Sequence, residues 1–202
     1  MKNTCLLFFA IILFSCIGCT SSSKQYHIVG TLPSTDYDGE WMYLVPVENR
    51  EGGIDSVKIK DAAFEFTGEG EEMRILRLRP VLRIRIQELL LVTEPGEISV
   101  KADSIGSVTG TPQNDALQAW KDDLDKKRNI YVFAYDGFKS SKTREDSLKF
   151  LRIRDSLMQV DAERNFMFLK EQGNNTLGTF MQKSLRSSLN EQQKKELDAS
   201  LK

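Results

Sequence analysis

Hydrophobic and polar residues alternate through the first half of the chain with the period of β-strands. The alternation is strict in residues 64–67 and continues through residues 74–86 on both sides of Pro80. Other short runs are rich in β-branched or aromatic residues, at 26–30, 41–45, 54–59, 89–93 and 98–100. Glycine-containing turn signals separate these runs. About eight short strands with this spacing predict antiparallel hairpins folded into a β-sandwich or a partly open barrel.

After residue 112 the hydrophobic pattern takes a helical period. Thr111 or Asn114 can cap a first helix, and residues 143–146 (TRED) resemble a capping box with Asp in the usual Glu position. Behind this box, apolar residues recur every three or four positions, at Phe150, Ile153, Leu157, Val160 and Met167. The predicted helices cover about residues 115–128, 143–172, 177–187 and 191–201. A β-rich part followed by a helical part predicts an α+β fold.

The first 19 residues have the pattern of an export signal. Lys2 is followed by an uncharged apolar run at residues 5–14, which is shorter than the about 20 residues that a permanent membrane helix needs. We therefore predict a signal peptide. The sequence LFSC at 13–16 resembles the bacterial lipobox, in which the cysteine is acylated, for example with palmitate, and becomes the mature N-terminus. Cys16 is the favoured lipidation site and Cys19 the alternative.

These features divide the chain into four predicted parts. Residues 1–19 form the signal peptide and lipobox, and residues 20–25 form a polar tether. Residues 26–111 form the β-domain, and residues 112–202 form the helical segment. Attached acyl chains hold a protein at a membrane surface.

Composition narrows the chemistry that the mature part can perform. The chain has 202 residues, with 28 basic and 29 acidic side chains and a net charge of -1, which creates no broad field to attract nucleic acid. All three cysteines lie within the first 19 residues. The spacing of Cys16 and Cys19 is that of a redox dithiol, but its place at the end of a signal peptide favours processing instead. We expect no catalytic residue, no metal site and no cofactor.

Four segments resemble the DUF4369 family, an N-terminal domain of unknown function in lipoproteins of Bacteroidetes. They are 26–30 (YHIVG), 54–57 (IDSV) leading to 64–68 (FEFTG), 94–98 (EPGEI) and 108–114 (VTGTPQN). The likeness spans about residues 26–180, and it departs from the family pattern at 61–64 (DAAF), where glycine is more usual. Members of this family commonly carry a thioredoxin-like domain after the β-domain, in thiol–disulfide interchange proteins. No segment of this sequence resembles that domain, so the redox activity is not expected here.

A row of arginines is the best candidate for a binding surface. Arg77, Arg79, Arg83 and Arg85 alternate with aliphatic residues around Pro80. On a hairpin they form a cationic stripe that can bind carboxylate or phosphate groups in bidentate geometry. The alternative is the solvated face of a half-buried sheet, where arginine stems cover apolar surface.

Other polar and aromatic positions have structural interpretations. His27 has no second histidine to share a metal. Glu69, Glu71 and Glu72 lack the spacing of a calcium loop and suit a charged hairpin tip. The charged run at 122–128 is interpreted as the solvated face of a helix. The side chains expected in the core are Trp41, Tyr43 and Trp120.

Four Asp-Ser-aliphatic triplets contain the serines Ser56, Ser104, Ser147 and Ser156. Envelope proteins of the Bacteroidetes group that the chain resembles are O-glycosylated at such triplets, so the resemblance implies these serines as glycosylation sites. The alternative is that Asp and Ser are simply favoured at strand edges and helix N-termini.

The expected function is that of a non-catalytic binding or scaffolding module in the bacterial cell envelope, anchored to the outer membrane and facing the periplasm. One alternative is an accessory or degenerate member of a thiol–disulfide interchange system. A second is a protein that binds an anionic glycan through the arginine stripe. The expected partners are the membrane, through the lipid anchor, and a thioredoxin-like or other envelope protein, without nucleic acid.

Overall fold

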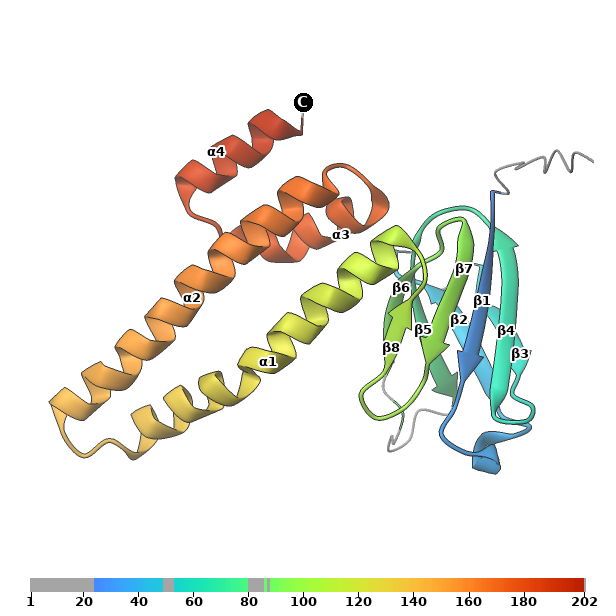
Figure 1. Ribbon diagram of the computed structural model, residues 1–202, viewed down its shortest axis with the longest axis horizontal. Coiled ribbons are helices and arrows are strands. Elements are labelled where there is room, and N and C mark those ends of the chain that lie inside the picture. The colour runs from blue at the N-terminus through green and yellow to red at the C-terminus, as the bar shows by residue number, and fades with distance from the viewer. Residues whose placement is uncertain (1–23, 49–52, 80–85, 87, 202) are drawn as a thin grey trace, which may run out of the picture.

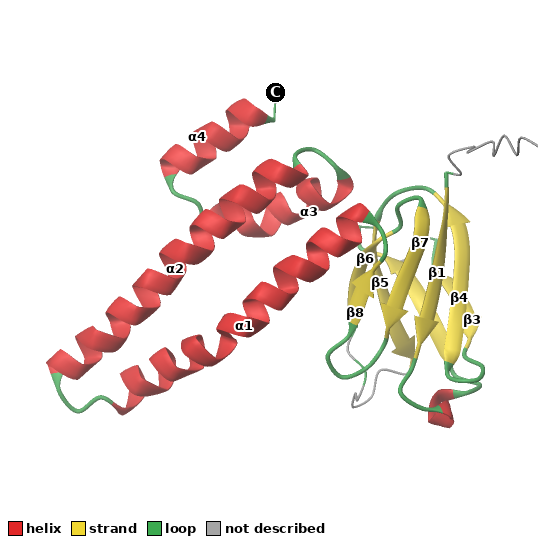
Figure 2. Cartoon of the chain, viewed as in Figure 1, coloured by secondary structure: helices red, strands yellow, loops and turns green. Residues whose placement is uncertain are grey.

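A β-sandwich occupies one end of the molecule and four helices extend from it (Figures 1 and 2). The computed structural model describes residues 24–48, 53–79, 86 and 88–201. The expected α+β class, with eight strands followed by helices, is confirmed, and the two sheets do not close into a barrel. Among the residues described, no helix combines the length and the apolar character needed to cross a membrane.

Each of the two sheets has four strands. The strands are β1 (Gln25–Thr31), β2 (Trp41–Pro46), β3 (Asp55–Lys58), β4 (Ala63–Glu69), β5 (Met73–Arg79), β6 (Leu89–Val92), β7 (Gly96–Lys101) and β8 (Ser107–Thr109). The first sheet has the order β4-β1-β7-β8 and the second the order β3-β2-β5-β6. Every pairing is antiparallel except that of β1 with β7, which is parallel. The expectation of antiparallel hairpins misses this pair because its strands are distant in the chain.

The core of the sandwich follows from the alternation of side chains along the strands. Every second residue points between the sheets, and Ile28, Leu44 and Leu76 are completely or almost completely buried there. On β5 the residues that alternate with Leu76 point to the opposite, outer face of the second sheet. At one end of that face, Met73 and Val92 pack against the helices rather than against solvent. The helical part is therefore joined to the sandwich by its own apolar cluster.

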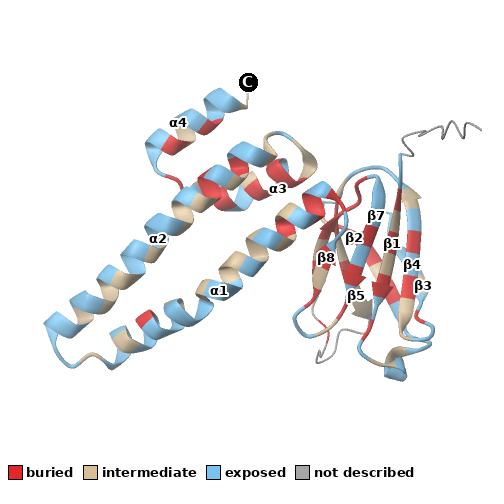
Figure 3. Ribbon diagram, viewed as in Figure 1, coloured by how far each residue is buried: buried red, intermediate tan, exposed pale blue. Residues whose placement is uncertain are grey.

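Helices α1 and α2 form a long antiparallel hairpin. The helices are α1 (Pro112–Ser140), α2 (Arg144–Gln172), α3 (Thr176–Leu185) and α4 (Glu191–Ser200), with the short 3-10 helices η1 (Thr35–Tyr37) and η2 (Arg186–Ser188). With 29 residues each, α1 and α2 are about 43 Å long. The end of α2 agrees with the prediction, and the Thr143 side chain caps its start by accepting from the N–H of Asp146 at 3.1 Å. Figure 3 shows that most of the hairpin far from the sandwich is exposed.

Helix α1 is longer than the sequence pattern predicts. The expected end near residue 128 is wrong, because residues 130–138 (IYVFAYDGF) continue the helix to Ser140. Gly137 does not end it, since the ring of Phe150 from α2 packs directly against the glycine. A Cβ atom at position 137 would lie 2.2 Å from that ring. The glycine thus permits close approach of the two helices.

Two expectations about individual side chains also need correction. Trp41 is not a core residue, because its side chain lies on the outer face of β2, is 41% exposed, and has Lys58 Nζ 5.5 Å from its ring centre. Asp123 and Lys127 do not belong to a purely solvated face. Both face α2, where Arg164 donates to Asp123 at 2.6 Å and Lys127 donates to Asp161 at 3.3 Å.

Candidate functional site

The β6–β7 turn and the start of α1 meet in a buried polar junction. The Glu94 carboxylate accepts from the backbone N–H groups of Gln113 at 2.7 Å and Asn114 at 3.1 Å, and from Gln113 Nε2 at 3.2 Å. All three residues are buried. The Thr111 side chain, which the sequence suggested as a cap, makes no capping hydrogen bond. Glu94 therefore takes the role of an N-cap from a different element and places a negative charge at the positive end of the helix.

Asn114 joins the same helix to the edge of the second sheet. Its Oδ1 accepts from the N–H of Val92 at 2.9 Å, and its Nδ2 donates to the Val92 carbonyl at 2.8 Å and to Thr111 Oγ1 at 2.8 Å. β6 is an edge strand, so the Asn114 amide supplies partners that a neighbouring strand would otherwise supply.

Gln113 extends the junction to α3. Its Oε1 accepts from the N–H of Leu177 at 2.9 Å, and its Nε2 donates to Glu71 Oε1 at 2.8 Å. Thr176 Oγ1 donates to the same Glu71 oxygen at 2.7 Å. Glu71 is exposed, as predicted, but it links the sandwich to two helices and does not lie at a hairpin tip, because β4 and β5 belong to different sheets. We refer to Glu71, Glu94, Gln113 and Asn114 as the helix–sandwich junction.

This arrangement of donors and acceptors indicates a structural role for the junction. The Glu94 carboxylate accepts three N–H donors from within the protein, all of them from residues at the start of α1. Of the four junction residues, Glu94 comes from the 94–98 segment, Gln113 and Asn114 come from the 108–114 segment, and Glu71 lies between β4 and β5. These two segments fix the helices on the sandwich.

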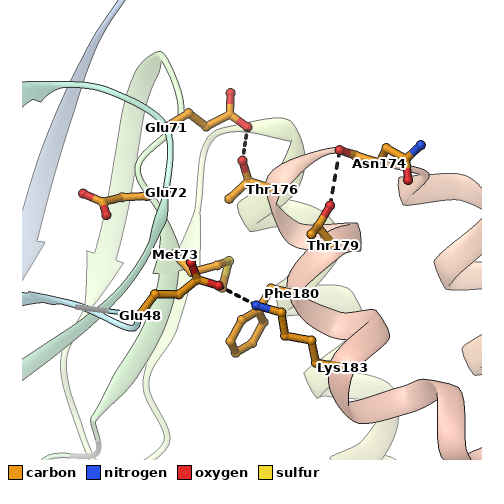
Figure 4. A pocket seen from close by; sticks show the side chains of 9 residues that line it. All are labelled: Glu48, Glu71, Glu72, Met73, Asn174, Thr176, Thr179, Phe180 and Lys183. Carbon is orange, nitrogen blue, oxygen red and sulfur yellow. Dashed lines mark hydrogen bonds and ion pairs between the residues drawn. The ribbon is translucent and has the colours of Figure 1, made fainter. Parts of the chain in front are cut away.

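A cleft of about 290 Å³ lies beside the junction, between the sandwich and α3. Figure 4 shows Glu48, Glu71 and Glu72 on one side and Thr176 and Lys183 on the other. Each carboxylate has a partner across the cleft or within the sandwich. Lys183 Nζ donates to Glu48 at 2.5 Å and thereby lowers the pKa of that carboxyl, while Glu72 pairs with Arg74 at 2.6 Å. The Glu48–Lys183 pair and the hydrogen bond from Thr176 to Glu71 bridge the cleft.

Arg74 is the arginine of β5 that the sequence interpretation overlooked. It shares the inward face with Leu76 and is buried, with ion pairs to Asp55 at 3.0 Å and to Glu72 at 2.6 Å. Its Nη1 also donates to the Gly53 carbonyl at 3.0 Å. A buried guanidinium with two carboxylates and a carbonyl is satisfied internally. Burial raises the pKa of the nearby Tyr26 phenol.

The arginine stripe is only partly within the described residues. Arg77 and Arg79 occupy alternate positions of β5, opposite Tyr43 and Trp41 of β2. Arg77 is one-fifth exposed, and its Nη1 lies 3.8 Å from Glu88 Oε1. Arg83 and Arg85 lie outside the described residues, so the stripe as a whole stays a prediction.

The remaining candidate residues do not converge on one site. His27 Nε2 lies 3.4 Å from Glu65 Oε2 on the exposed face of the first sheet, and Glu69 accepts from Gln25 at 3.2 Å. Within the described part of the chain, no three His, Cys, Asp or Glu side chains are arranged to hold a metal ion. The lipidation candidates Cys16 and Cys19 lie outside it.

The four triplet serines differ in their surroundings. Ser56 on β3, Ser104 in the β7–β8 turn and Ser156 on α2 are exposed. Ser147 is partly buried, and its Oγ donates to the Thr143 carbonyl at 3.0 Å. O-glycosylation stays a prediction. Mass spectrometry of the protein from its native envelope tests it, and we expect modification at the three exposed serines before Ser147.

A polar seam holds the middle of the hairpin together. Tyr131 donates a short hydrogen bond to Asp161, which also pairs with Lys127 at 3.3 Å and Arg164 at 3.2 Å. Burial and this hydrogen bond raise the pKa of Tyr131 to about 12. Hydrogen bonds from Lys127 and Arg164 lower the pKa of Asp123. The seam ties α1 to α2, because Asp161 contacts Tyr131 and Lys127 across the two helices and Arg164 contacts Asp123.

Comparison with known proteins identifies the β-rich part. Residues 26–117 match the family model described as a domain of unknown function, DUF4369. This match covers the part of the chain in which the four segments lie, and the matched range ends just after the junction residues on α1. No curated protein and no solved structure matches the chain.

Proposed function

We propose that this protein is a non-catalytic scaffolding lipoprotein of the bacterial cell envelope. An acyl anchor on Cys16, or on Cys19, holds it to the outer membrane on the periplasmic side. The sandwich is the base from which the α1–α2 hairpin reaches other proteins. The observation that carries this proposal is the helix–sandwich junction, whose buried hydrogen bonds attach a long hairpin to the sandwich at a defined position.

The surface of the hairpin supports a role in protein contact. Phe133 and Tyr135 are 58% and 61% exposed. Single exposed apolar side chains are common on monomeric proteins, but several close together typically mark a site of protein contact. Residues 130–138 are apolar around most of the helix circumference, a pattern typical of a helix that is covered on several sides. Packing against α2 covers only one of these sides.

The direction of the hairpin relative to the anchor favours a protein partner over the anchoring membrane. Figure 1 shows the start of β1 and the α1–α2 loop at opposite ends of the molecule. The nine residues 17–25 that follow an anchor on Cys16 span at most about 32 Å when extended. A membrane-anchored copy would therefore hold its hairpin away from the bilayer that carries the anchor.

Crosslinking of the tagged protein in its native envelope, with partners identified by mass spectrometry, tests this function. Recovery of envelope proteins that disappear when Tyr135 and Phe138 are changed to Glu supports a scaffold that acts through the hairpin. The matched control is Val160→Glu, a change on the opposite side of the hairpin. Recovery of an unchanged set of partners from all variants contradicts this role of the hairpin.

The identity of the partners separates the alternatives. A thioredoxin-like or cytochrome-maturation protein supports an accessory role in thiol–disulfide interchange, which the family resemblance suggests. Retention on an anionic glycan that is lost in Arg79→Glu and Arg85→Glu supports the arginine stripe as a glycan-binding surface.

A further inference from the structure

One face of the hairpin carries apolar residues at intervals of seven. On α1 these are Leu124, Tyr131 and Phe138, and on α2 they are Leu151 and Met158. Residues seven apart lie on the same side of a helix, so the two rows run side by side along the hairpin. We call this surface the distal face. A hollow of about 350 Å³ opens on it, over Ala134 and between the two rows.

The same two rows are already covered closer to the sandwich. Leu117, seven residues before Leu124, is buried in one cluster with Leu177 and Met181 of α3. Asn165, seven residues after Met158, donates to Ser188 Oγ of η2 at 3.1 Å. The base of this face is thus packed by the chain itself. In the described part of the chain no helix continues this cover over the distal face, and Met158 is 57% exposed.

We propose that a second copy of the chain covers the distal face, in a two-fold symmetric dimer whose hairpins run antiparallel. The inference rests on the proposed scaffold function and names its first partner. Parallel hairpins would bring the α3 and η2 segments of both copies to the same level, where they would collide. Antiparallel hairpins leave these segments at opposite ends and superpose the two distal faces. The two-fold axis then passes close to Tyr131 on α1 and Met158 on α2.

The residues of the distal face complement themselves under this symmetry. With Tyr131 at the centre, Phe138 of one copy meets Leu124 of the other. There, a second hollow of about 420 Å³ is lined by Leu124 and by Ile105, whose side chain is 72% exposed. A knob and a hollow on the same surface are what an isologous interface requires.

The charges around the face also suit two antiparallel copies. Lys139 of one copy falls within a helical turn of Asp125 of the other, and Arg128 falls beside the ring of Tyr135. An opposite-charge pair and a cation–π contact are each favourable. Within one copy, Arg128 already pairs with Asp125 at 2.5 Å, so the contact region carries no concentrated repulsive charge.

The available area suits a reversible dimer. Tyr135 and Phe138 are 61% and 43% exposed, and an aromatic side chain can bury about 150–250 Å². Together with Met158, Leu124, Tyr131 and the stems of the basic residues, we estimate roughly 1,000 Å² over both copies, which is near the lower bound for a specific interface. Confinement to a membrane by a lipid anchor raises the effective concentration of the copies and favours such a dimer.

Site-specific photocrosslinking of the full chain tests the proposal. Two differently tagged forms are produced together in the envelope, each with a photoreactive amino acid at Met158. The control carries it at Val160, which is 52% exposed and lies about 200° around the same helix. We expect a crosslinked product that contains both tags from position 158, and only background from position 160.

A second variant separates contact from folding. With the photoreactive group at Phe138, the additional change Met158→Glu should abolish the two-tag product, whereas Val160→Glu should leave it. Both changes are at exposed positions, and circular dichroism checks that each variant is folded. A product from 158 and 160 alike, a product with another protein only, or no product at any position overturns the dimer. Fractionation of the same samples reports membrane attachment separately, so a failed dimer is distinguishable from a failed anchor.

Discussion

Replacement of Glu94 by Ala should detach the start of α1 from the sandwich. The change removes a carboxylate that accepts three hydrogen bonds at 2.7–3.2 Å, two of them from backbone N–H groups. Those N–H groups belong to the first turn of α1 and have no other partner within the helix. Gln113 and Asn114 are buried, so water reaches the freed groups poorly.

The expected loss of stability follows from these contacts. Loss of a helix cap costs about 1 kcal/mol, and a buried donor left without an acceptor costs about 1–3 kcal/mol. Allowing for some relaxation, we expect Glu94→Ala to lower the free energy of unfolding by about 3 kcal/mol, which is roughly a hundredfold in the equilibrium constant. Glu94→Gln keeps one acceptor oxygen and should lose only about 1 kcal/mol.

The two tryptophans allow the two parts of the protein to be followed separately in urea. Trp41 lies on β2, and Trp120 lies on α1, where it packs near Phe168 and donates to Asn165 at 3.1 Å. Trp41→Phe leaves only the helical reporter, and Trp120→Phe leaves only the sandwich reporter. We expect coincident transitions in the parent protein. In Glu94→Ala, the Trp120 transition should move to lower urea than the Trp41 transition.

A matched control and a clear contrary result make this prediction decisive. Glu97→Ala removes an exposed carboxylate on the neighbouring strand β7 and should change stability by less than about 0.5 kcal/mol. If Glu94→Ala behaves like Glu97→Ala at both reporters, the junction does not hold the helices to the sandwich and the reasoning fails.

Three further predictions concern pH and packing. Hydrogen bonds, the strongest from the Gly106 N–H, lower the pKa of Asp103 to about 2 from its ordinary 3.8. The ionised Asp103 carboxylate should therefore stabilise the fold fully above about pH 4, and this stabilisation should be lost between pH 4 and 2. An NMR titration midpoint near 4 for Asp103 would contradict this. Burial and a hydrogen-bonded carboxylate raise the pKa of Tyr131 to about 12 from 10.0. The free energy of unfolding should therefore fall as the pH rises from about 10 to 12, and this fall should be smaller in Tyr131→Phe. A tyrosinate absorbance titration in which no phenol titrates near pH 12 would refute the assignment. Gly137→Ala places a Cβ 2.2 Å from the Phe150 ring. This change should destabilise the protein by about 1–2 kcal/mol, although Ala has the better helix propensity. A urea midpoint higher than that of the parent protein would show that the two helices do not approach so closely.

The sequence predicts the sandwich well because strand patterning is local. Alternation at residues 64–67 and 74–79 appears in β4 and β5, since each inward side chain is two residues from the next. The three-residue strand β8 is too short to show a pattern. The parallel pairing of β1 with β7 depends on chain segments about 70 residues apart and has no local signal.

The distal half of α1 was missed for a different reason. Residues 130–138 are apolar without a clear polar face, so they show no helical period. The helix persists because Phe150 packs on Gly137 and because the polar seam around Asp161 ties α1 to α2.

The helix–sandwich junction was only half visible in the sequence. The segments with Glu94 and Gln113 were singled out for their family likeness, but 19 positions separate the two residues. The sequence offers Thr111 as the cap before Pro112, and only the structure shows that Thr111 makes no capping hydrogen bond and that another element supplies the acceptor. Which carboxylate supplies it becomes apparent only when the β6–β7 turn is placed beside α1.

Metabolic labelling with an alkyne fatty acid, combined with membrane fractionation, tests the central claim that this protein is an anchored scaffold. The parent protein and the variants Cys16→Ser and Cys19→Ser are compared in a bacterial envelope. The account predicts that the parent is labelled and membrane-bound, and that Cys16→Ser loses both properties while Cys19→Ser retains them. An unlabelled parent that is released with the soluble periplasmic proteins would contradict the account.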